Sequence, residues 1–293
     1  MKIHEVAARD GLQNESAILS VEQKMRLLDL LAATKPDSLE ITSFVRADRV
    51  PQFADAAEVC ERLRDAEWRN EIPCVGLVIN MRGYESFSNS GLDAITAVIG
   101  ANQQFSKDNS GMSVERALQV NEELVAAAHA DGFPVRMYLS MAFGSPSSAV
   151  EKNLVSELVA ASAEMNVDRI VLSDTVGVAT PQLTQEIIAN AMRYCDVSQL
   201  GMHMHDTYGR ALSNCEAGID LGVEYFDASA GGTGGCPFAP GASGNLATGA
   251  LLGLAQRRQC APQAMTLDAI DSATEFLSCA LNKELARGVK LRP

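Results

Sequence analysis

Short apolar segments rich in β-branched residues alternate with longer segments of helical periodicity along almost the whole chain. The segments that we interpret as strands are 2–8, 38–42, 74–79, 94–99, 135–141, 169–173, 200–204 and 224–228. Helical periodicity is found at 21–33, 53–66, 113–131, 149–165, 182–195 and 208–221. Eight strands that alternate with helices pair in parallel through right-handed crossovers. The sequence therefore predicts an α/β fold, a (β/α)8 TIM barrel.

An open, doubly wound sheet is the alternative to this barrel. That fold usually carries a Gly-x-Gly-x-x-Gly motif after its first strand, and this chain lacks it there. Two further helical segments, 249–258 and 266–286, are expected to cap or close the barrel. We expect residues 1–293 to form a single catalytic domain with a C-terminal helical region at about 246–293.

Candidate helix ends support the assignment. Ser20 precedes the first helical segment, where a hydroxyl can accept a hydrogen bond from a free backbone N–H. Gly132, Gly201 and Gly222 stand where a helix is expected to end and a strand to begin, as C-cap glycines do.

Charge and hydropathy exclude several classes of partner. The chain has 37 acidic and 24 basic residues, a net charge of −13, and no basic stripe, so no nucleic-acid partner is expected. No apolar run approaches the length of a transmembrane helix, so no membrane partner is expected either. The seven cysteines are scattered without a Cys-x-x-Cys pair, which favours reduced thiols and a cytoplasmic protein.

Polar residues from distant parts of the chain fall at the ends of the predicted strands. In a barrel of this type the chemistry lies at the C-terminal ends of the strands. The candidate site residues are Arg9 and Asp10 at the end of the first strand, Glu40 in the second, Asp174 just after the sixth, His203 and His205 at the end of the seventh, and Cys236 and Asn245 on the loop after the eighth. The sequence thus predicts one site assembled at one rim.

His203 and His205 are two of only four histidines. Side chains two residues apart on a strand point to the same side, so the two imidazoles can hold one divalent metal, although a lone histidine is more often structural. With Asp10 and the side-chain oxygen of Asn245 the set offers two nitrogens and two oxygens. Such a set suits Mg²⁺ or Mn²⁺ and would also accept Co²⁺ or Zn²⁺.

Two other features of the predicted rim are open to more than one interpretation. Arg9 and Asp10 could be a surface charge pair, but a strand end followed by Gly11 favours a functional role, and Arg9 is the expected partner of a buried Glu40. Residues 231–244 contain six glycines together with Cys236. This stretch could be a simple turn, or a shaped loop that brings a thiol to a ligand.

Five ordered segments carry a resemblance that covers essentially the whole chain. They are 5–15 (Glu5-Val6 and Arg9-Asp10-Gly11-Leu12-Gln13-Asn14-Glu15), 40–45, 173–181, 203–209 and 234–248. These segments closely resemble the 3-hydroxy-3-methylglutaryl-CoA lyase family, whose members are metal-dependent lyases on TIM barrels.

The resemblance implies a reaction and roles for individual residues. A 3-hydroxyacyl-CoA would be cleaved between its second and third carbons to acetyl-CoA and a keto acid. Residues matching Asp10, His203, His205 and Asn245 bind the divalent metal in that family, and those matching Arg9 and Cys236 are catalytic. Asp10, next to the metal, is also the expected acceptor of the hydroxyl proton, and Glu40 and Asp174 are further catalytic candidates.

The resemblance says less about the rest of the substrate and about assembly. Asn80 and Lys107 match stretches near the CoA-binding side of the family, although an interpretation as ordinary loop residues stands beside this one. The expected partners are thus an acyl-CoA substrate and, by resemblance, a second copy of the chain in a homodimer.

Three positions depart from the family pattern. A usual Cys-x-x-Gly-Cys-Pro-Tyr stretch is Met141-Ala142-Phe143-Gly144-Ser145-Pro146-Ser147 here. Gly249 replaces a usual acidic residue, and Thr233 replaces a usual leucine. Because Ser147 and Gly249 are small, we hypothesise a bulkier or more polar acyl chain.

Three other functions remain open on the sequence. Claisen-condensing synthases share Arg-Asp-Gly and His-x-His, but they usually carry Glu where Leu12 stands and generally add a C-terminal regulatory domain. An aldolase acting on a keto acid is disfavoured by the Cys236 loop. A non-catalytic barrel is disfavoured, because the candidate metal ligands and the Cys236 loop would then have no function.

Overall fold

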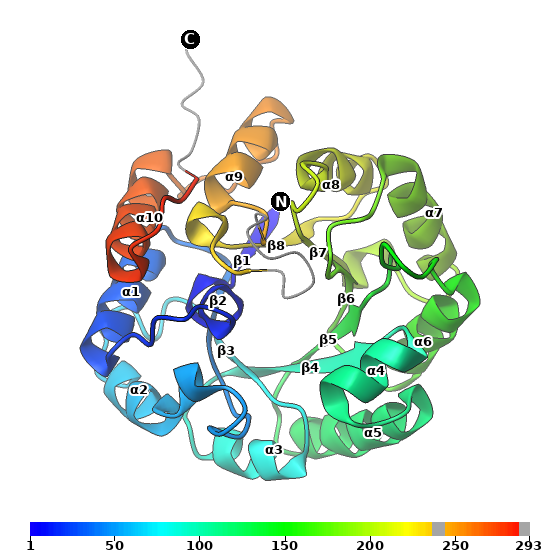
Figure 1. The fold of residues 1–293 in the computed structure, drawn as a ribbon, viewed down its shortest axis with the longest axis horizontal. Helices are drawn as coiled ribbons and strands as arrows, with labels where there is room; N and C mark the ends of the chain where they lie inside the picture. Colours follow the sequence, from blue (N-terminus) through cyan, green and yellow to red (C-terminus); the bar gives the residue numbers. More distant parts are fainter. Residues whose placement is uncertain (236–243, 287–293) are drawn as a thin grey trace.

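A closed barrel of eight parallel strands forms the centre of the computed structural model, which describes residues 1–235 and 244–286 (Figure 1). The strands are β1 (Lys2–Glu5), β2 (Ser38–Ser43), β3 (Cys74–Leu77), β4 (Ala94–Gly100), β5 (Val135–Ser140), β6 (Arg169–Asp174), β7 (Leu200–Met204) and β8 (Tyr225–Ala228). They follow chain order around the barrel, and β8 pairs with β1. The predicted (β/α)8 barrel is confirmed, and the open sheet is excluded.

Helices surround the strands on all sides in Figure 1. They are α1 (Val21–Ala33), α2 (Ala56–Leu63), α3 (Met81–Ser88), α4 (Gln103–Ser110), α5 (Val114–Ala130), α6 (Lys152–Glu164), α7 (Pro181–Ala191), α8 (Ala211–Asp220), α9 (Thr248–Arg257) and α10 (Leu267–Leu281). Helix α10 packs against α1, so the C-terminal helices close the outer ring as expected. Within the described residues, no helix has both the length and the hydrophobicity needed to span a membrane.

The predicted helix ends are confirmed at three of four positions. The Ser20 hydroxyl accepts a hydrogen bond from the Gln23 backbone N–H, and the Gln23 side chain accepts one from the Ser20 N–H. Gly132 and Gly222 adopt φ values of +83° and +91° after their helices. The prediction for Gly201 is wrong, because this residue lies inside β7.

The first strand is shorter than expected. It ends at Glu5, and residues Ala7–Gly11 form a single wide helical turn, η1. The buried Glu5 carboxylate causes part of this change, because its Oε1 accepts a hydrogen bond from the Ala7 N–H at 2.9 Å. The turn places Arg9 and Asp10 over the mouth of the barrel instead of along its wall.

Helices α3 and α4 were not predicted, because each has only eight residues, which is too short for a clear helical period in the sequence. Each begins at an asparagine that caps its first turn. The Asn80 Oδ1 accepts from the Gly83 N–H, and the Asn102 Oδ1 accepts from the Phe105 N–H, both at 2.9 Å. An asparagine directly after an apolar strand was the sequence signal for both helices.

The inside of the barrel is unusually polar. Apolar branched side chains usually fill such barrels, but here the register places His4 and His203 on either side of Asp227. All three side chains are buried. The main apolar core therefore lies between the strands and the outer helices, and the barrel interior carries charge toward one rim.

Candidate functional site

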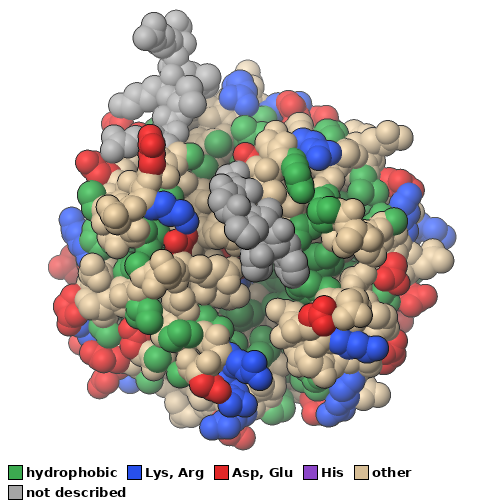
Figure 2. All heavy atoms as spheres, in the orientation of Figure 1, with side chains coloured by type: hydrophobic (Ala, Val, Ile, Leu, Met, Phe, Trp, Pro, Cys, Tyr) green, Lys and Arg blue, Asp and Glu red, His purple; other side chains and the backbone are tan. Residues whose placement is uncertain are grey.

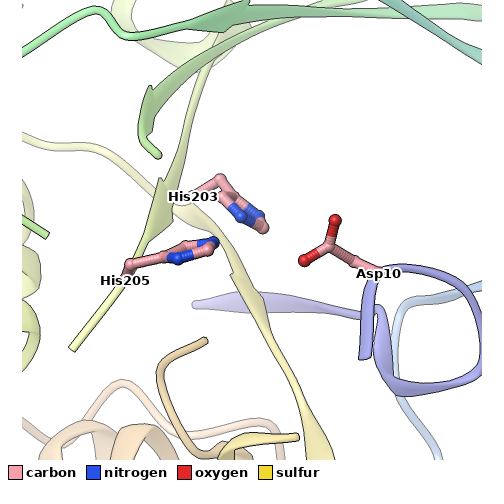
Figure 3. Close-up of side chains that lie close together, drawn as sticks. All are labelled: Asp10, His203 and His205. Atoms are coloured by element: carbon pink, nitrogen blue, oxygen red, sulfur yellow. The ribbon is translucent and has the colours of Figure 1, made fainter. Parts of the chain in front are cut away.

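Asp10, His203 and His205 point toward one another at the mouth of the barrel (Figure 3). One ligand atom from each residue lies within 4.8 Å of the other two. The two imidazole centroids are 5.2 Å apart, as expected for side chains on the same face of one strand. Asp10 and the two histidines, almost 200 positions apart in the sequence, thus form one cluster.

Asn245 joins this cluster through the chain segment that follows β8. Residue 245 forms an isolated antiparallel bridge with His205, and the Leu246 N–H donates to the Met204 carbonyl at 3.0 Å. The Asn245 Nδ2 donates to Asp10 Oδ2 at 2.7 Å. Gly234 is required beside it, because its φ is +113° and a Cβ there would lie 2.5 Å from Asn245 Nδ2.

Arg9 is fixed between two carboxylates. Its Nε donates to Glu40 Oε2 at 2.6 Å, and its Nη1 donates to Asp10 Oδ1 at 2.7 Å. Glu40 is fully buried and Arg9 is 5% exposed. The predicted pairing of Arg9 with Glu40 is confirmed, and the guanidinium is held rigidly next to the cluster.

Charge at the cluster favours a carboxylate and a neutral imidazole. Burial opposes ionisation of Asp10, but the charges of Arg9, His203 and His205 outweigh it and lower the pKa of Asp10. Burial lowers the pKa of His205 to about 4. Burial also opposes protonation of His203, but the hydrogen bond to Asp227 and the charge of Asp10 raise its pKa. Asp10 is therefore a weak base and a ready cation ligand.

The donor set fits a divalent cation. It combines an ionised carboxylate with two imidazoles, and an amide lies directly beside it. The Nδ1 of His205 is buried and has no hydrogen-bond partner among the described residues. An unpaired buried polar atom is costly, and ligation of a cation by the two imidazoles would offset the cost of burying them.

Asp174 lies at the end of β6 but faces its own loop. Its Oδ1 accepts from the Val178 N–H and its Oδ2 from the Ala179 N–H, both at 2.9 Å. Burial raises the pKa of Asp174 to about 6. The structure does not bring Asp174 into the Asp10 cluster, and its contacts indicate a role in shaping the loop after β6.

Asn80 and Lys107 are separate from this cluster. Asn80 caps α3 and Lys107 lies on α4, and both are exposed on the part of the mouth formed by β3 and β4. Cys236 lies outside the described residues. The other six cysteines lie within the described residues, and all are free thiols.

Four further polar residues escaped the sequence analysis as site residues: Arg136, Tyr138 and Asp227 inside the barrel, and Glu5 at the end of β1. Asp227 on β8 bonds to Arg136, Tyr138 and His203. Glu5 accepts from the Ala7 and Ala230 N–H groups and from the Thr248 hydroxyl, and burial raises its pKa to about 7. The available signal was polar residues at every second position of buried strands, as in Arg136 and Tyr138.

The positions that depart from the family pattern are not equivalent. Thr233 is buried beside the cluster, where its carbonyl accepts from Asn245 Nδ2 at 3.0 Å. Ser147 is exposed at the rim. Gly249 is buried in the first turn of α9. Of the two small residues, Ser147 is thus the one that a substrate could reach from solvent.

The mouth of the barrel is hollowed, as Figure 2 shows in the same orientation. Hydrophobic side chains gather around this hollow, whereas many acidic side chains lie toward the outer edge of the face. A small apolar cluster of Met141 and Val176, with Phe105 and Val178 packed against it, is separate from the main core. The charged cluster therefore shares its rim with apolar surface.

Comparisons with known proteins agree over most of the chain. The family described as HMGL-like matches residues 1–277. Hydroxymethylglutaryl-CoA lyase, mitochondrial, of Gallus gallus is 38% identical over 252 residues, which cover 85% of this chain and 83% of the relative. The cytoplasmic 3-hydroxy-3-methylglutaryl-CoA lyase of Danio rerio is 37% identical over 86% of this chain and 75% of its own length.

Solved structures give the same picture. The HMG-CoA lyase of Brucella melitensis has a TM-score of 0.92 and 33% identity, and the match covers 96% of this chain and 99% of that one. An HMG-CoA lyase of Acinetobacter baumannii, solved in complex with coenzyme A and 3-methylmalate, has a TM-score of 0.90 and 28% identity. That match covers 100% of this chain and 97% of the other.

Proposed function

This chain belongs to the HMGL-like family, and from that premise we propose that it is a carbon–carbon lyase acting on a 3-hydroxyacyl-CoA. The substrate is 3-hydroxy-3-methylglutaryl-CoA or a close analogue, and the products are acetyl-CoA and a keto acid. The relatives are named as lyases. Nothing in these comparisons favours the condensing synthase or the aldolase.

The observation that carries this proposal is the meeting of a cation-binding cluster with a fixed guanidinium. Asp10, His203 and His205 converge, and Arg9 is bonded to Asp10 within the same turn. Cleavage needs the alcohol proton to leave while the bond between the second and third carbons breaks. The electron pair of that bond passes to the thioester as an enolate, which must then gain a proton.

We assign Asp10, His203, His205 and Asn245 to a divalent metal, with Mg²⁺ or Mn²⁺ preferred because half of the expected ligand atoms are oxygens. When bound, the metal would lower the pKa of the substrate hydroxyl and hold the substrate oxygens in place. Asp10 is also the proposed acceptor of the hydroxyl proton; because its own pKa is lowered, it is a weak base, and the transfer requires a hydroxyl whose pKa is lowered as well.

Arg9 is assigned to the developing enolate. Burial opposes its charge, but Glu40 and Asp10 outweigh that effect and raise the pKa of Arg9, so the guanidinium remains a cation. A preorganised cation next to developing negative charge stabilises the transition state without having to reorganise. Glu40 is then a positioning residue, because its carboxylate accepts a hydrogen bond from Arg9 Nε and holds the guanidinium in place. Asp174 positions the loop after β6 in a similar way.

Cys236 is assigned to the final proton transfer. The glycine-rich stretch leading to it begins beside the cluster, where the Thr233 carbonyl bonds to Asn245. A thiol that gives its proton to the second carbon of the enolate would complete acetyl-CoA. For the nucleotide end of CoA we propose Lys107 as a cation and Asn80 as a polar contact, since both are exposed at the rim.

Location and assembly complete the proposal. We propose a cytoplasmic protein because one relative carries that description and the described cysteines are free. A homodimer remains a prediction from the family resemblance, and sedimentation analysis of the purified protein at several concentrations will test it.

The proposed reaction is tested by incubating the full chain with a panel of CoA thioesters, with and without EDTA, and measuring acetyl-CoA by mass spectrometry. We expect acetyl-CoA and acetoacetate from 3-hydroxy-3-methylglutaryl-CoA or acetyl-CoA and a homologous keto acid from an analogue. EDTA should abolish the release of acetyl-CoA from either substrate. Release that is unchanged by EDTA, or no release from any 3-hydroxyacyl-CoA, would contradict the proposal.

A further inference from the structure

Asp227 has more charged and polar partners than any role in strand pairing requires. It lies on β8 inside the barrel and is 3% exposed. Its Oδ1 accepts from Arg136 Nη2 at 2.8 Å, and its Oδ2 accepts from the Tyr138 hydroxyl. The same Oδ2 lies 3.2 Å from His203 Nδ1. A buried carboxylate thus connects two residues of β5 with one imidazole of the cluster.

These contacts determine which nitrogen of His203 carries a proton. The charge of Arg136 stabilises an ionised Asp227, and a carboxylate can only accept hydrogen bonds. His203 Nδ1 must therefore be the donor, and in the neutral imidazole this leaves the Nε2 lone pair free. The Tyr138 ring packs edge-on against the His203 ring, with centroids 5.7 Å apart, and further restricts its rotation.

His205 lacks a comparable arrangement. Its Nδ1 is buried without a hydrogen-bond partner among the described residues. The two histidines of the cluster are therefore unequal, since a carboxylate orients only one of them. Metal-binding histidines commonly donate their second nitrogen to a carboxylate or a carbonyl, and such partners tune metal affinity.

We propose that Asp227 is a positioning residue, held by Arg136 and Tyr138, which fixes His203 with its Nε2 lone pair toward the cation site. This inference rests on the proposed metal-binding function. It assigns to three barrel-interior residues a part in preparing the site before any cation arrives.

Asp227→Asn is the sharpest test, because it replaces one carboxylate oxygen, an acceptor, with an NH₂ donor and leaves the side-chain volume almost unchanged. Arg136 can only donate, so the amide oxygen of the variant must face Arg136 and the amide NH₂ must face His203. His203 Nδ1 then has to accept a hydrogen bond, and its proton moves to Nε2. An imidazole protonated at Nε2 cannot ligate through that nitrogen, which is the wrong-tautomer effect known from hydrolase triads.

Two measurements on the full chain follow from this. In the metal-free protein at alkaline pH, ¹⁵N spectra of the imidazoles should show the His203 proton on Nδ1, and in Asp227→Asn on Nε2. Titration with Mn²⁺ alone, followed by electron paramagnetic resonance of the free ion, should give a dissociation constant raised roughly 10- to 100-fold in the variant. Tyr138→Phe keeps the Arg136 contact and should cause a smaller loss.

Asp168→Asn is the matched control. Asp168 is also a carboxylate at a strand, but its Oδ2 accepts from the Val135 N–H, away from the cluster. Its Mn²⁺ affinity should equal that of the wild type. A wild-type His203 protonated on Nε2 would overturn the inference without any variant, and so would an unchanged Mn²⁺ affinity in Asp227→Asn. Failure of the wild type to bind Mn²⁺, or unchanged binding in His203→Ala, would instead contradict the proposed metal site.

Discussion

The two sides of the barrel mouth are built differently. On the side formed by β7, β8, β1 and β2, buried charges hold one another in place, and this charged side consists of Arg9, Asp10, Glu40, His203, His205 and Asn245. On the side formed by β3 to β6, which we call the open side, Asn80, Lys107 and Ser147 are exposed and Met141 packs with Val176. We propose from this difference that the chemistry belongs to the charged side and substrate choice to the open side.

Replacement of the proposed proton donor should have the largest effect on turnover. Cys236→Ala is expected to lower kcat by roughly 10²- to 10⁴-fold, the usual size of a general-acid contribution, while the metal stays bound. Cys279→Ala removes an exposed thiol of α10 and should leave kcat unchanged. Steady-state kinetics with metal analysis of both variants tests this, and an unaltered kcat for Cys236→Ala would remove the thiol from the mechanism.

Removal of the fixed guanidinium should come next. Arg9→Met keeps much of the side-chain volume but loses the cation, and we expect kcat to fall roughly 10²- to 10³-fold. Because Glu40 would then be a buried carboxylate without its cation, the double variant Arg9→Met/Glu40→Gln separates stability from catalysis. It should recover thermal stability but not activity. A double variant with normal kcat would show that Arg9 acts only on the fold.

A change on the open side should alter discrimination between substrates and leave the chemistry intact. Ser147→Tyr restores the aromatic residue that is usual in the family, and we expect it to lower kcat/KM for 3-hydroxyacyl-CoAs longer than methylglutaryl-CoA by roughly 10-fold. Turnover of 3-hydroxy-3-methylglutaryl-CoA itself should be maintained. A wild-type preference for the shortest substrate would contradict a widened acyl pocket.

The smallest effect is expected at the edge of the open side. Lys107→Ala should raise KM by roughly 2- to 5-fold with kcat unchanged, because an exposed ion pair contributes at most about 1 kcal/mol. The increase should shrink at high salt. Lys35→Ala, an exposed lysine after α1, is the control and should not change KM. Equal KM values for Lys107→Ala and the wild type would exclude a CoA contact there.

Sequence patterns were sufficient for the charged side because most of its residues lie at or just after the ends of strands. The His203–His205 spacing on a strand and the position of Asp10 after β1 allowed the cluster to be predicted before any coordinates. The pairing of Arg9 with Glu40 followed from the cost of burying a lone carboxylate. Alternation of strands and helices was likewise enough for the barrel.

The barrel-interior residues that were missed share one physical cause. Arg136, Tyr138 and Asp227 lie at positions that alternate with apolar residues, and in a sequence such a strand looks half-exposed even when both faces are buried. Only the closed register shows that these side chains meet under His203. The turn η1 was missed for a different reason: the Gly11 N–H donates to the Val6 carbonyl at 3.1 Å, and no pattern in the sequence distinguishes such a wide turn from a continuing strand.

Metal stoichiometry of the purified chain tests the central claim most directly. Dialysis against Mn²⁺ followed by elemental analysis should give one ion per chain for the wild type. Asp10→Ala and His203→Ala should retain essentially none, because each removes a ligand from the cluster. An Asp10→Ala protein that still holds one ion per chain with wild-type affinity would show that the charged side is not a metal centre.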